Sequence, residues 1–213
     1  MSSEVTDVTI NTVTAHDCTY RIFNPGGLIG RPLAEGRPYE RHLLDWIFDA
    51  GFTGTAVDVG AHVGNHTLWL AAVCGLRVHA FEPNHTEALR ANVALNDLDD
   101  QVIVHDCALG AEPTTAQWSG KDRLSTGTGP VPVLPLDKFH LEDVSVIKVD
   151  VEDMEPEVLR GAEATIRDQR PTLFLEARDL ACHKAIADVI APWGYEHSGA
   201  AKTATPVERW VPR

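Results

Sequence analysis

The stretch Val57-Asp58-Val59-Gly60-Ala61-His62-Val63-Gly64 decides the fold of this chain. It continues a β-branched, apolar run that begins at Thr55, and it precedes an apolar segment, so it predicts a strand, a tight turn and a helix. Gly60 and Gly64 allow the turn and let a ligand approach the backbone without a Cβ atom in the way. In open α/β sheets, ligands bind outside the carboxyl ends of the strands, which is where this turn lies.

Strand and helix signals alternate on both sides of this turn. Apolar residues at helical spacing predict helices over residues 39–48, 65–74, 84–95, 158–166 and 180–190. Apolar runs predict strands at 55–59, 78–81, 102–104, 144–149 and 172–175. Strands that are buried on both faces and alternate with helices indicate an α/β fold with a doubly wound, mostly parallel sheet. Two short strands near 195–196 and 207–210, with no helix between them, predict a hairpin on the sheet edge.

An acidic residue follows the second predicted strand. Glu82 stands at the carboxyl end of that strand, 22 residues after Gly60. A carboxylate at this place accepts both hydrogen bonds from a ribose 2′,3′-diol. The next residues, Asn84-His85-Thr86-Glu87, have the pattern of a capping box at a helix start. The glycine turn and Glu82, in this order, indicate a cofactor that contains adenosine.

The residues of the turn also distinguish between cofactors. Asp58 starts the motif, and Ala61 stands where a dinucleotide-binding turn has a glycine. An acidic loop suits a cofactor with a sulfonium and an amino group better than one with two phosphates, so we expect S-adenosyl-L-methionine. An NAD(P)-linked oxidoreductase is the alternative, and the absent third glycine and absent Tyr-x-x-x-Lys dyad count against it. A non-catalytic cofactor-binding module is a third possibility.

These residues resemble the opening motifs of the FkbM family of class I methyltransferases. The similarity covers 57–68 and 80–84 and continues, in family order, at 136–137, 147–152, 157–162 and 171–176. The resemblance implies a Rossmann-like, seven-stranded sheet with an antiparallel edge strand. It also implies methyl transfer to a hydroxyl of a sugar, a glycan or a secondary metabolite. One position departs from the family pattern, because Asp153 replaces the glycine that usually follows Asp-Val-Glu.

The resemblance and the motif together predict the cofactor contacts. The turn and Glu82 supply most of them, and the residues after the third strand are expected beside the adenine. The predicted contacts are Asp58, Gly60, Ala61, His62, Gly64, Asn65, Glu82, Asp106, Cys107 and Ala108.

Asp150 and Glu152 are the predicted catalytic residues, because they follow the strand that brings the acceptor to the methyl group in class I methyltransferases. A carboxylate within reach of an alcohol takes its proton, which contributes about 10²–10⁴-fold to the rate. The same carboxylates, with Asp153, Glu155 and Glu176, are hard oxygen ligands of the kind that Mg²⁺ prefers. Acidic strand ends are common without metal, so we predict no metal site.

The segment 110–132, rich in Gly, Thr and Ser, reads as the one long irregular stretch of the chain. Loops of this length are commonly functional lids or disordered connectors. Trp118, with Lys121, Asp122 and Arg123 near it, could stack on a sugar ring and hydrogen-bond to its hydroxyls, so we expect a lid that closes over the acceptor.

Composition limits the class of protein and its partners. The 213 residues are expected to form one methyltransferase domain, with strands and a helix at 1–50 before a cofactor-binding core at 51–213. The net charge of −13 disfavours nucleic acid and anionic membranes, so a small-molecule or glycan acceptor is expected. Four distant cysteines, no signal peptide and no apolar run long enough to span a bilayer favour the cytoplasm. The sequence does not indicate an oligomeric state.

Overall fold

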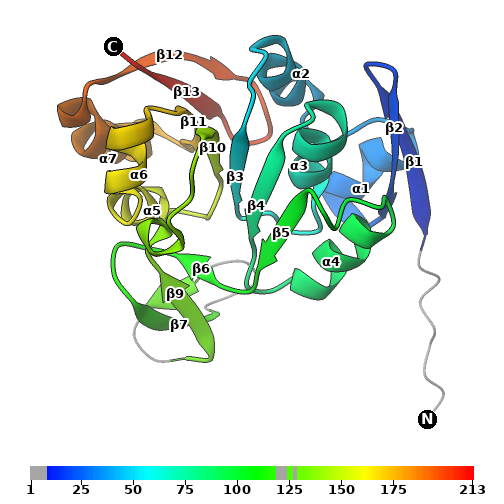
Figure 1. The fold of residues 1–213 in the computed structure, drawn as a ribbon, viewed down its shortest axis with the longest axis horizontal. Helices are drawn as coiled ribbons and strands as arrows, with labels where there is room; N and C mark the ends of the chain where they lie inside the picture. Colours follow the sequence, from blue (N-terminus) through cyan, green and yellow to red (C-terminus); the bar gives the residue numbers. More distant parts are fainter. Residues whose placement is uncertain (1–8, 119–123, 127–128) are drawn as a thin grey trace.

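The computed structural model describes residues 9–118, 124–126 and 129–213. Its centre is a seven-stranded sheet with the strand order β12-β13-β11-β10-β3-β4-β5 (Figure 1). The strands are β3 (Thr55–Val59), β4 (Arg77–Phe81), β5 (Val102–His105), β10 (Val144–Val149), β11 (Thr172–Glu176), β12 (Tyr195–Ala201) and β13 (Val207–Pro212). β5, β4, β3, β10 and β11 are parallel, whereas β13 is antiparallel to both β11 and β12. The predicted parallel sheet and terminal hairpin are both confirmed.

The strand order reverses beside β3. The chain passes from β3 to β4 and β5 on one side, and then returns to place β10 on the other side of β3. A crevice opens at such a reversal, because the connections leave the two strands toward opposite faces of the sheet. The turn after β3, which the sequence motif marks, therefore lies at this crevice.

Helices cover both faces of the sheet. One face packs against α2 (Arg41–Asp49), α3 (Asn65–Leu68), the π-helix η1 (Trp69–Val73) and α4 (Thr86–Ala94). The other packs against α5 (Glu155–Arg160), α6 (Glu163–Gln169) and α7 (Leu180–Ile190), and two 3₁₀ turns, η2 (Leu136–Phe139) and η3 (Ala191–Trp193), adjoin it. Within the described ranges, no helix combines the length and apolar character needed to cross a membrane.

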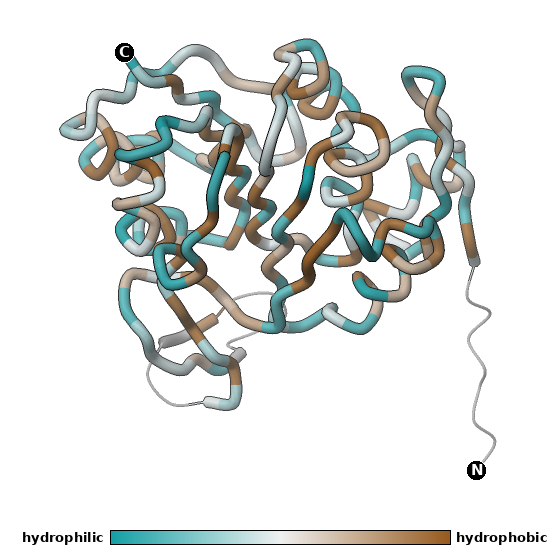
Figure 2. The backbone as a smooth tube through the Cα atoms, viewed as in Figure 1, coloured by the Kyte–Doolittle hydropathy of each residue, from teal (hydrophilic) through white to brown (hydrophobic). Residues whose placement is uncertain are grey.

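Side-chain alternation in β3 divides the core into two layers. Val57 and Val59 join the cluster formed with α5, α6 and α7, whereas Ala56 joins the cluster formed with α2 and α4. All five β3 residues are buried, as expected for a central parallel strand. Figure 2 shows the same concentration of hydrophobic residues along the central strands. Asp58, between two buried valines, must therefore face the layer of α2 and α3.

An N-terminal hairpin is attached to the core through α4. It consists of β1 (Ile10–Ala15) and β2 (Cys18–Phe23), and the helix α1 (Gly27–Ala34) follows it. The side-chain oxygen of Asn92 accepts from the Phe23 amide at 2.7 Å, and that of Asn96 accepts from the Arg21 amide at 2.7 Å. The sequence patterns did not predict α1, because it contains glycines and Pro32, which disfavour helices.

The helix predicted over 158–166 is broken into α5 and α6. Gly161 packs so closely that a Cβ atom there would lie 2.0 Å from the carbonyl oxygen of Gly110. The amide of Asp137 donates to the Gly161 carbonyl at 3.0 Å. The Asp137 carboxylate then accepts from the amides of Ala164 and Thr165, both at 2.9 Å, and so begins α6. Contacts with a distant segment, rather than the local pattern, place this break.

The segment 110–132, predicted to be irregular, contributes to a second sheet. Its strands are β6 (Ala108–Leu109), β7 (Thr114–Trp118), β8 (Leu124–Thr126) and β9 (Val131–Leu134), in the order β6-β9-β7-β8 (Figure 1). Ala116, Val131 and Val133 form its small buried cluster with Ala108. The sequence pattern did not predict these short strands, because small and polar residues interrupt their apolar alternation. The Trp118 side chain and residues 121–123, on which the predicted lid depends, lie outside the described part of the chain.

Candidate functional site

A cavity of about 780 Å³ lies at the carboxyl ends of the central strands. This volume lies within the range of small-molecule sites, which is about 300–1,000 Å³. Five carboxylates line the cavity, and we call them the acidic wall: Glu40, Glu82, Asp150, Glu152 and Glu176. None of the described lining residues is a lysine or an arginine. The cavity therefore has a negative wall at the point where the strand order reverses.

Gly60 allows β3 and β10 to meet beneath the cavity. Its φ of 81° lies in the region that favours glycine, and a Cβ atom there would lie 2.0 Å from the Asp150 carbonyl oxygen. The amide of Asp150 donates to the carbonyl of Val59 at 3.1 Å, which holds the two strand ends together. Any side chain at Gly60 would separate them, so the glycine is required by this close approach.

A buried lysine joins two carboxylates across these strands. Lys148 lies opposite Asp58 in the strand register, and its Nζ is 3.5 Å from Asp58 Oδ1 and 3.3 Å from Asp150 Oδ2. Thr67 donates to the other oxygen of Asp58 at 2.6 Å. Burial lowers the pKa of Lys148, but the charges of Asp150 and Asp58 outweigh it and raise that pKa above its ordinary value. The lysine therefore stays charged.

Lys148 also determines the charge of Asp150. Burial raises the pKa of Asp150, but the charges of Lys148 and His66 outweigh it and hold that pKa below its ordinary value. The side chain of Asp150 is 30% exposed and lines the cavity. Asp150 is therefore an ionised carboxylate with one face toward the ligand space.

Glu176 lies beside Asp150 on the same face of the sheet. Val149 pairs with Leu175 in parallel register, so the residues that follow them, Asp150 and Glu176, lie side by side at the strand ends. Neighbouring strands are about 4.8 Å apart, which brings the two carboxyl groups close together. Burial, and then the charges of Asp150 and Glu152, raise the pKa of Glu176 to about 8. Glu176 therefore carries a proton at neutral pH.

The connection before α2 places two polar side chains, Tyr39 and Glu40, at the cavity. The Asn65 side chain accepts from the Tyr39 amide at 3.0 Å and donates to the Tyr39 carbonyl at 3.1 Å. Glu40 follows with a φ of 56°, and its Oε2 lies 3.2 Å from Nε2 of His66. Burial, and then the charges of Glu40 and Asp150, raise the pKa of Tyr39. Asn65 therefore positions Tyr39 and Glu40 at the cavity.

Glu82 is fixed in place by backbone amides. Its Oε2 accepts from His62 at 2.8 Å, and its Oε1 accepts from Asn84 at 2.6 Å and from His85 at 2.9 Å. The predicted capping box is therefore wrong in detail: α4 begins at Thr86, and the carboxylate of Glu82, rather than the Asn84 side chain, satisfies the preceding amides. A buried, oriented carboxylate results at the end of β4.

The structure divides the predicted site residues into two groups. Those that line the cavity are Gly60, His62, Glu82, Ala108, Asp150 and Glu152. The others are not among its lining residues, and they are Asp58, Ala61, Gly64, Asn65, Asp106 and Cys107. Several of these support the lining: Asp58 binds Lys148 and Thr67, and Asp106 accepts from the Thr86 hydroxyl at 3.1 Å.

The carboxylates considered as magnesium ligands do not gather around one point. Asp153 pairs with Arg178 at 2.5 Å, and Oε1 of Glu155 accepts from the Val151 amide at 3.0 Å. In the described part of the chain, no group of three or more His, Cys, Asp or Glu side chains is arranged to hold a metal ion. Asp153, the position that departs from the pattern in the sequence, has a φ of 80°, a backbone conformation that favours glycine.

The sequence patterns missed the roles of Lys148, Tyr39, Glu40 and His66. A signal existed for Lys148, because a lysine inside a strand buried on both faces needs a charged partner. Its register opposite Asp58 depends on the pairing of distant strands. Glu40 and His66 have no signal in the sequence, since they meet only through the fold.

The sheet order, the antiparallel β13 and the crevice at β3 define the Rossmann-like fold of class I methyltransferases. The chain belongs to the FkbM family, because the model of the methyltransferase FkbM domain matches residues 58–196. No curated protein matches the sequence.

Solved structures show the same fold at low sequence identity. Methyltransferase FkbM from Methylobacillus flagellatus KT is 22% identical with a TM-score of 0.57, and the match covers 74% of this chain and 44% of that one. The chain thus spans less than half of its length. Sp1610 of Streptococcus pneumoniae, assigned as a tRNA (m1A22) methyltransferase, is 13% identical over 80% of this chain and 69% of that one, with a TM-score of 0.56. A human methyltransferase 10 domain containing protein is 12% identical over 81% and 80%, with a TM-score of 0.52.

Replacing Lys148 with methionine should destabilise the fold strongly. The substitution leaves the buried Asp58 carboxylate without its cation, and breaking a buried pair in this way costs about 3–5 kcal/mol. The free energy of unfolding, measured in urea, tests this. Lys184→Met is the matched control, because Lys184 is an exposed residue paired with Asp188 on one helix, and pairs of that kind contribute about 0.3–0.5 kcal/mol. Equal stability of the two variants would contradict the buried ion pair.

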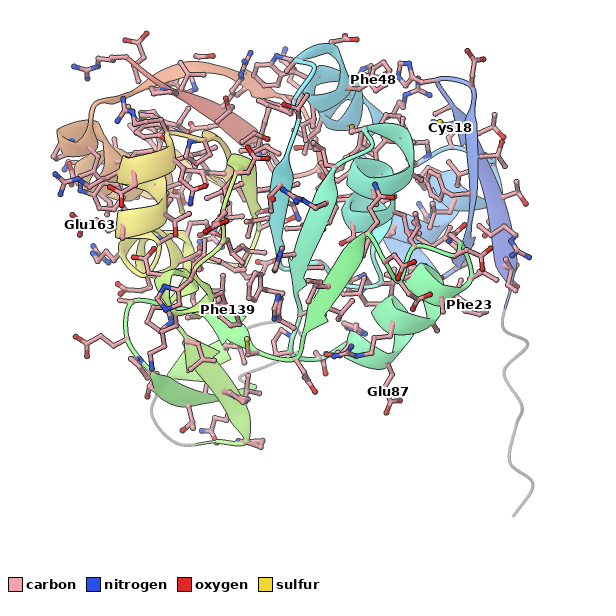
Figure 3. All side chains as sticks on the ribbon, in the orientation of Figure 1. Cys18, Phe23, Phe48, Glu87, Phe139 and Glu163 are labelled. Atoms are coloured by element: carbon pink, nitrogen blue, oxygen red, sulfur yellow. The ribbon has the colours of Figure 1, made fainter. Side chains whose placement is uncertain are left out.

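Replacing Glu176 with glutamine should change how stability depends on pH. The pKa of Glu176 rises on folding from 4.5 to about 8, so the folded chain binds this proton more tightly. Its contribution to stability is full below pH 4.5 and is lost as pH rises toward 8. Between these values, the melting temperature of Glu176→Gln should fall less steeply with pH than that of the wild type. Glu163→Gln, which alters a partly exposed residue of α6 that is paired with Arg167 (Figure 3), should keep the wild-type slope.

Proposed function

We propose that this chain binds S-adenosyl-L-methionine in the cavity and transfers its methyl group to a hydroxyl of a sugar, a glycan or a secondary metabolite. The observation that carries the proposal is the acidic wall at the crevice of an FkbM-family sheet. Both the sheet and the wall are built from this chain's own residues. The substrate class follows from the family resemblance and from charge.

The acidic wall fits a cofactor that carries positive charge. S-adenosyl-L-methionine has a sulfonium and an amino group, whereas NAD has two phosphates. Opposite unit charges 4 Å apart attract with about 4 kcal/mol near a protein surface, and like charges repel by as much. The wall therefore favours the methyl donor over NAD(P), the cofactor of the alternative oxidoreductase function. When bound, S-adenosyl-L-methionine supplies an activated methyl group.

Glu82 and Gly60 are the residues proposed to hold the adenosine. Backbone amides of His62, Asn84 and His85 fill three of the about four acceptor sites of the Glu82 carboxylate, so its Oε2 keeps capacity for one hydrogen bond from a ribose hydroxyl. Gly60 lines the cavity at the end of β3. Ala108 lines the cavity wall, where the family resemblance places the adenine, with Asp106 and Cys107 next to it in the chain.

Asp150 and Glu152 are proposed to position the acceptor. Methyl transfer is an in-line displacement at carbon, so most of the catalytic effect comes from orientation of the acceptor. Both side chains line the cavity, and Asp150 is held by Lys148 at a fixed place in the wall. An ionised Asp150 can accept a hydrogen bond from a hydroxyl acceptor and direct its oxygen toward the methyl group.

A small-molecule or glycan acceptor agrees with the charge of the protein. At −13, the chain repels the phosphates of a nucleic acid. An RNA methyltransferase has the same fold at 13% identity, which carries no information about this acceptor. The four cysteines are free thiols, which supports the reducing cytoplasm as the compartment.

Calorimetric titration with S-adenosyl-L-methionine, S-adenosylhomocysteine and NAD tests the cofactor. We expect binding of the first two and none of NAD, and binding of NAD alone would contradict the proposal. Transfer of a labelled methyl group to a panel of sugars, glycans, metabolites and tRNA then tests the acceptor. Cofactor binding without any transfer would support a non-catalytic module. Transfer to tRNA with a steep salt dependence would contradict a glycan or metabolite acceptor.

Replacing Glu82 with alanine should weaken cofactor binding. A hydrogen bond to a charged group contributes about 1.5–3 kcal/mol, which corresponds to roughly 10- to 150-fold in affinity. Calorimetry with S-adenosylhomocysteine measures the loss. Glu82→Gln should retain part of the affinity, and Glu87→Ala, at an exposed residue of α4 (Figure 3), should bind like the wild type. Wild-type affinity in a folded Glu82→Ala variant would remove Glu82 from the site.

Replacing Asp150 with asparagine should lower kcat and leave cofactor affinity nearly unchanged. The carboxylate is proposed to orient the acceptor during transfer, so its loss affects the transition state more than the bound cofactor. Steady-state kinetics with an acceptor from the panel measure kcat, and calorimetry measures the affinity. Asp188→Asn, at an exposed residue of α7, is the control. A parallel loss of cofactor binding would instead place Asp150 at the cofactor.

A further inference from the structure

The proposed reaction releases a proton that the acidic wall must receive. When a hydroxyl is methylated, its oxygen bonds to the methyl carbon while the carbon–sulfur bond breaks and leaves its electrons on sulfur. The hydroxyl proton must then pass to a base and later to water. The wall has several carboxylates, and their surroundings make them unequal bases.

We propose that Glu176 is the general base that takes the acceptor's proton, an assignment that rests on the proposed function. Glu176 lines the cavity at the end of β11, directly beside Asp150 in the strand register. Lys148 binds Asp150 and Asp58 but forms no ion pair with Glu176 among the described residues. Glu176 forms a side-chain hydrogen bond with Asp150, and it is the carboxyl of this group whose charge Lys148 does not balance.

Asp150 is the weaker base of the two. Its negative charge is matched by the buried ammonium of Lys148 at 3.3 Å, so it holds a proton only at low pH. Glu176 has the opposite environment, since burial and the neighbouring carboxylates raise its pKa to about 8. A base is most effective when its pKa lies near the working pH. The ionised Asp150 thus positions the acceptor and makes Glu176 a stronger base.

Several neighbouring groups affect the pKa of Glu176. Negative or acidic groups lie near it on the loop after β10, at the start of α5 and on the connection before α2. A hydrogen bond with the Thr205 side chain, on the connection between β12 and β13, opposes them by lowering the pKa of Glu176. The titratable groups concerned are Asp150, Glu152, Glu155 and Tyr39.

Infrared titration of the ligand-free protein tests the protonation of Glu176. With ¹³C-labelled glutamate, the band of a protonated carboxyl should disappear with a midpoint near pH 8 and should be absent from Glu176→Gln. Asp150→Asn removes the neighbouring charge and should move this midpoint to lower pH. Two results would overturn the assignment. One is complete ionisation of Glu176 at pH 6, and the other is a protonated-carboxyl band with the same midpoint in Glu176→Gln.

Kinetics test the catalytic role with an acceptor from the panel. In the wild type, kcat should rise with pH up to about 8. Glu176→Gln should lower kcat by about 10²–10⁴-fold, remove this rise and leave both KM values nearly unchanged. Glu176→Asp should restore part of the rate and of the pH dependence. A pH profile that survives in Glu176→Gln would overturn the role. Absence of S-adenosyl-L-methionine binding to the wild type would instead contradict the proposed function, and the infrared result would still report on Glu176.

Discussion

The buried ammonium of Lys148, between Asp58 on β3 and Asp150 after β10, joins the two strands at which the sheet reverses its order. Two carboxylates share one cation there, so the group keeps a net negative charge inside the protein. Glu176 is buried beside this group, and burial and then the charge of Asp150 raise its pKa, so Glu176 retains its proton to higher pH. One ion pair thus sets the geometry of the crevice, the charge of its wall and the unequal basicity of its acids.

Apolar periodicity and turn residues predicted those helices, strands and turns that form from neighbouring residues in the sequence. Apolar periodicity and turn residues predict β3, β10, β11, α7 and the terminal hairpin. The glycines of the motif predict the turn at Gly60. The break at Gly161, the helix α1 and the small sheet were missed, because they depend on contacts between distant segments or have poor propensity. The same limit applies to the site, where Glu40 meets His66 only after folding.

The motif that marks the site contains residues of two kinds. Gly60 and His62 border the cavity, whereas Asp58 and Asn65 lie behind it and hold Lys148 and Tyr39 in place. The sequence alone does not distinguish these two kinds of residue, because a motif shows which residue types occur and not which of them contact a ligand. Asp58 and Asn65 still need their particular side chains, because Asp58 pairs with the buried Lys148 and Asn65 hydrogen-bonds to the backbone of Tyr39.

The cavity wall extends beyond the part of the chain that the family shares. The matched region ends at residue 196, yet Ala204 and Thr205, between β12 and β13, line the cavity. Residues 25, 26, 28, 29, 39 and 40, which precede the matched region, line it too. These segments do not belong to the central strands of the sheet. The part of the cavity lining that they contribute can therefore change in shape or charge while the crevice between β3 and β10 stays intact.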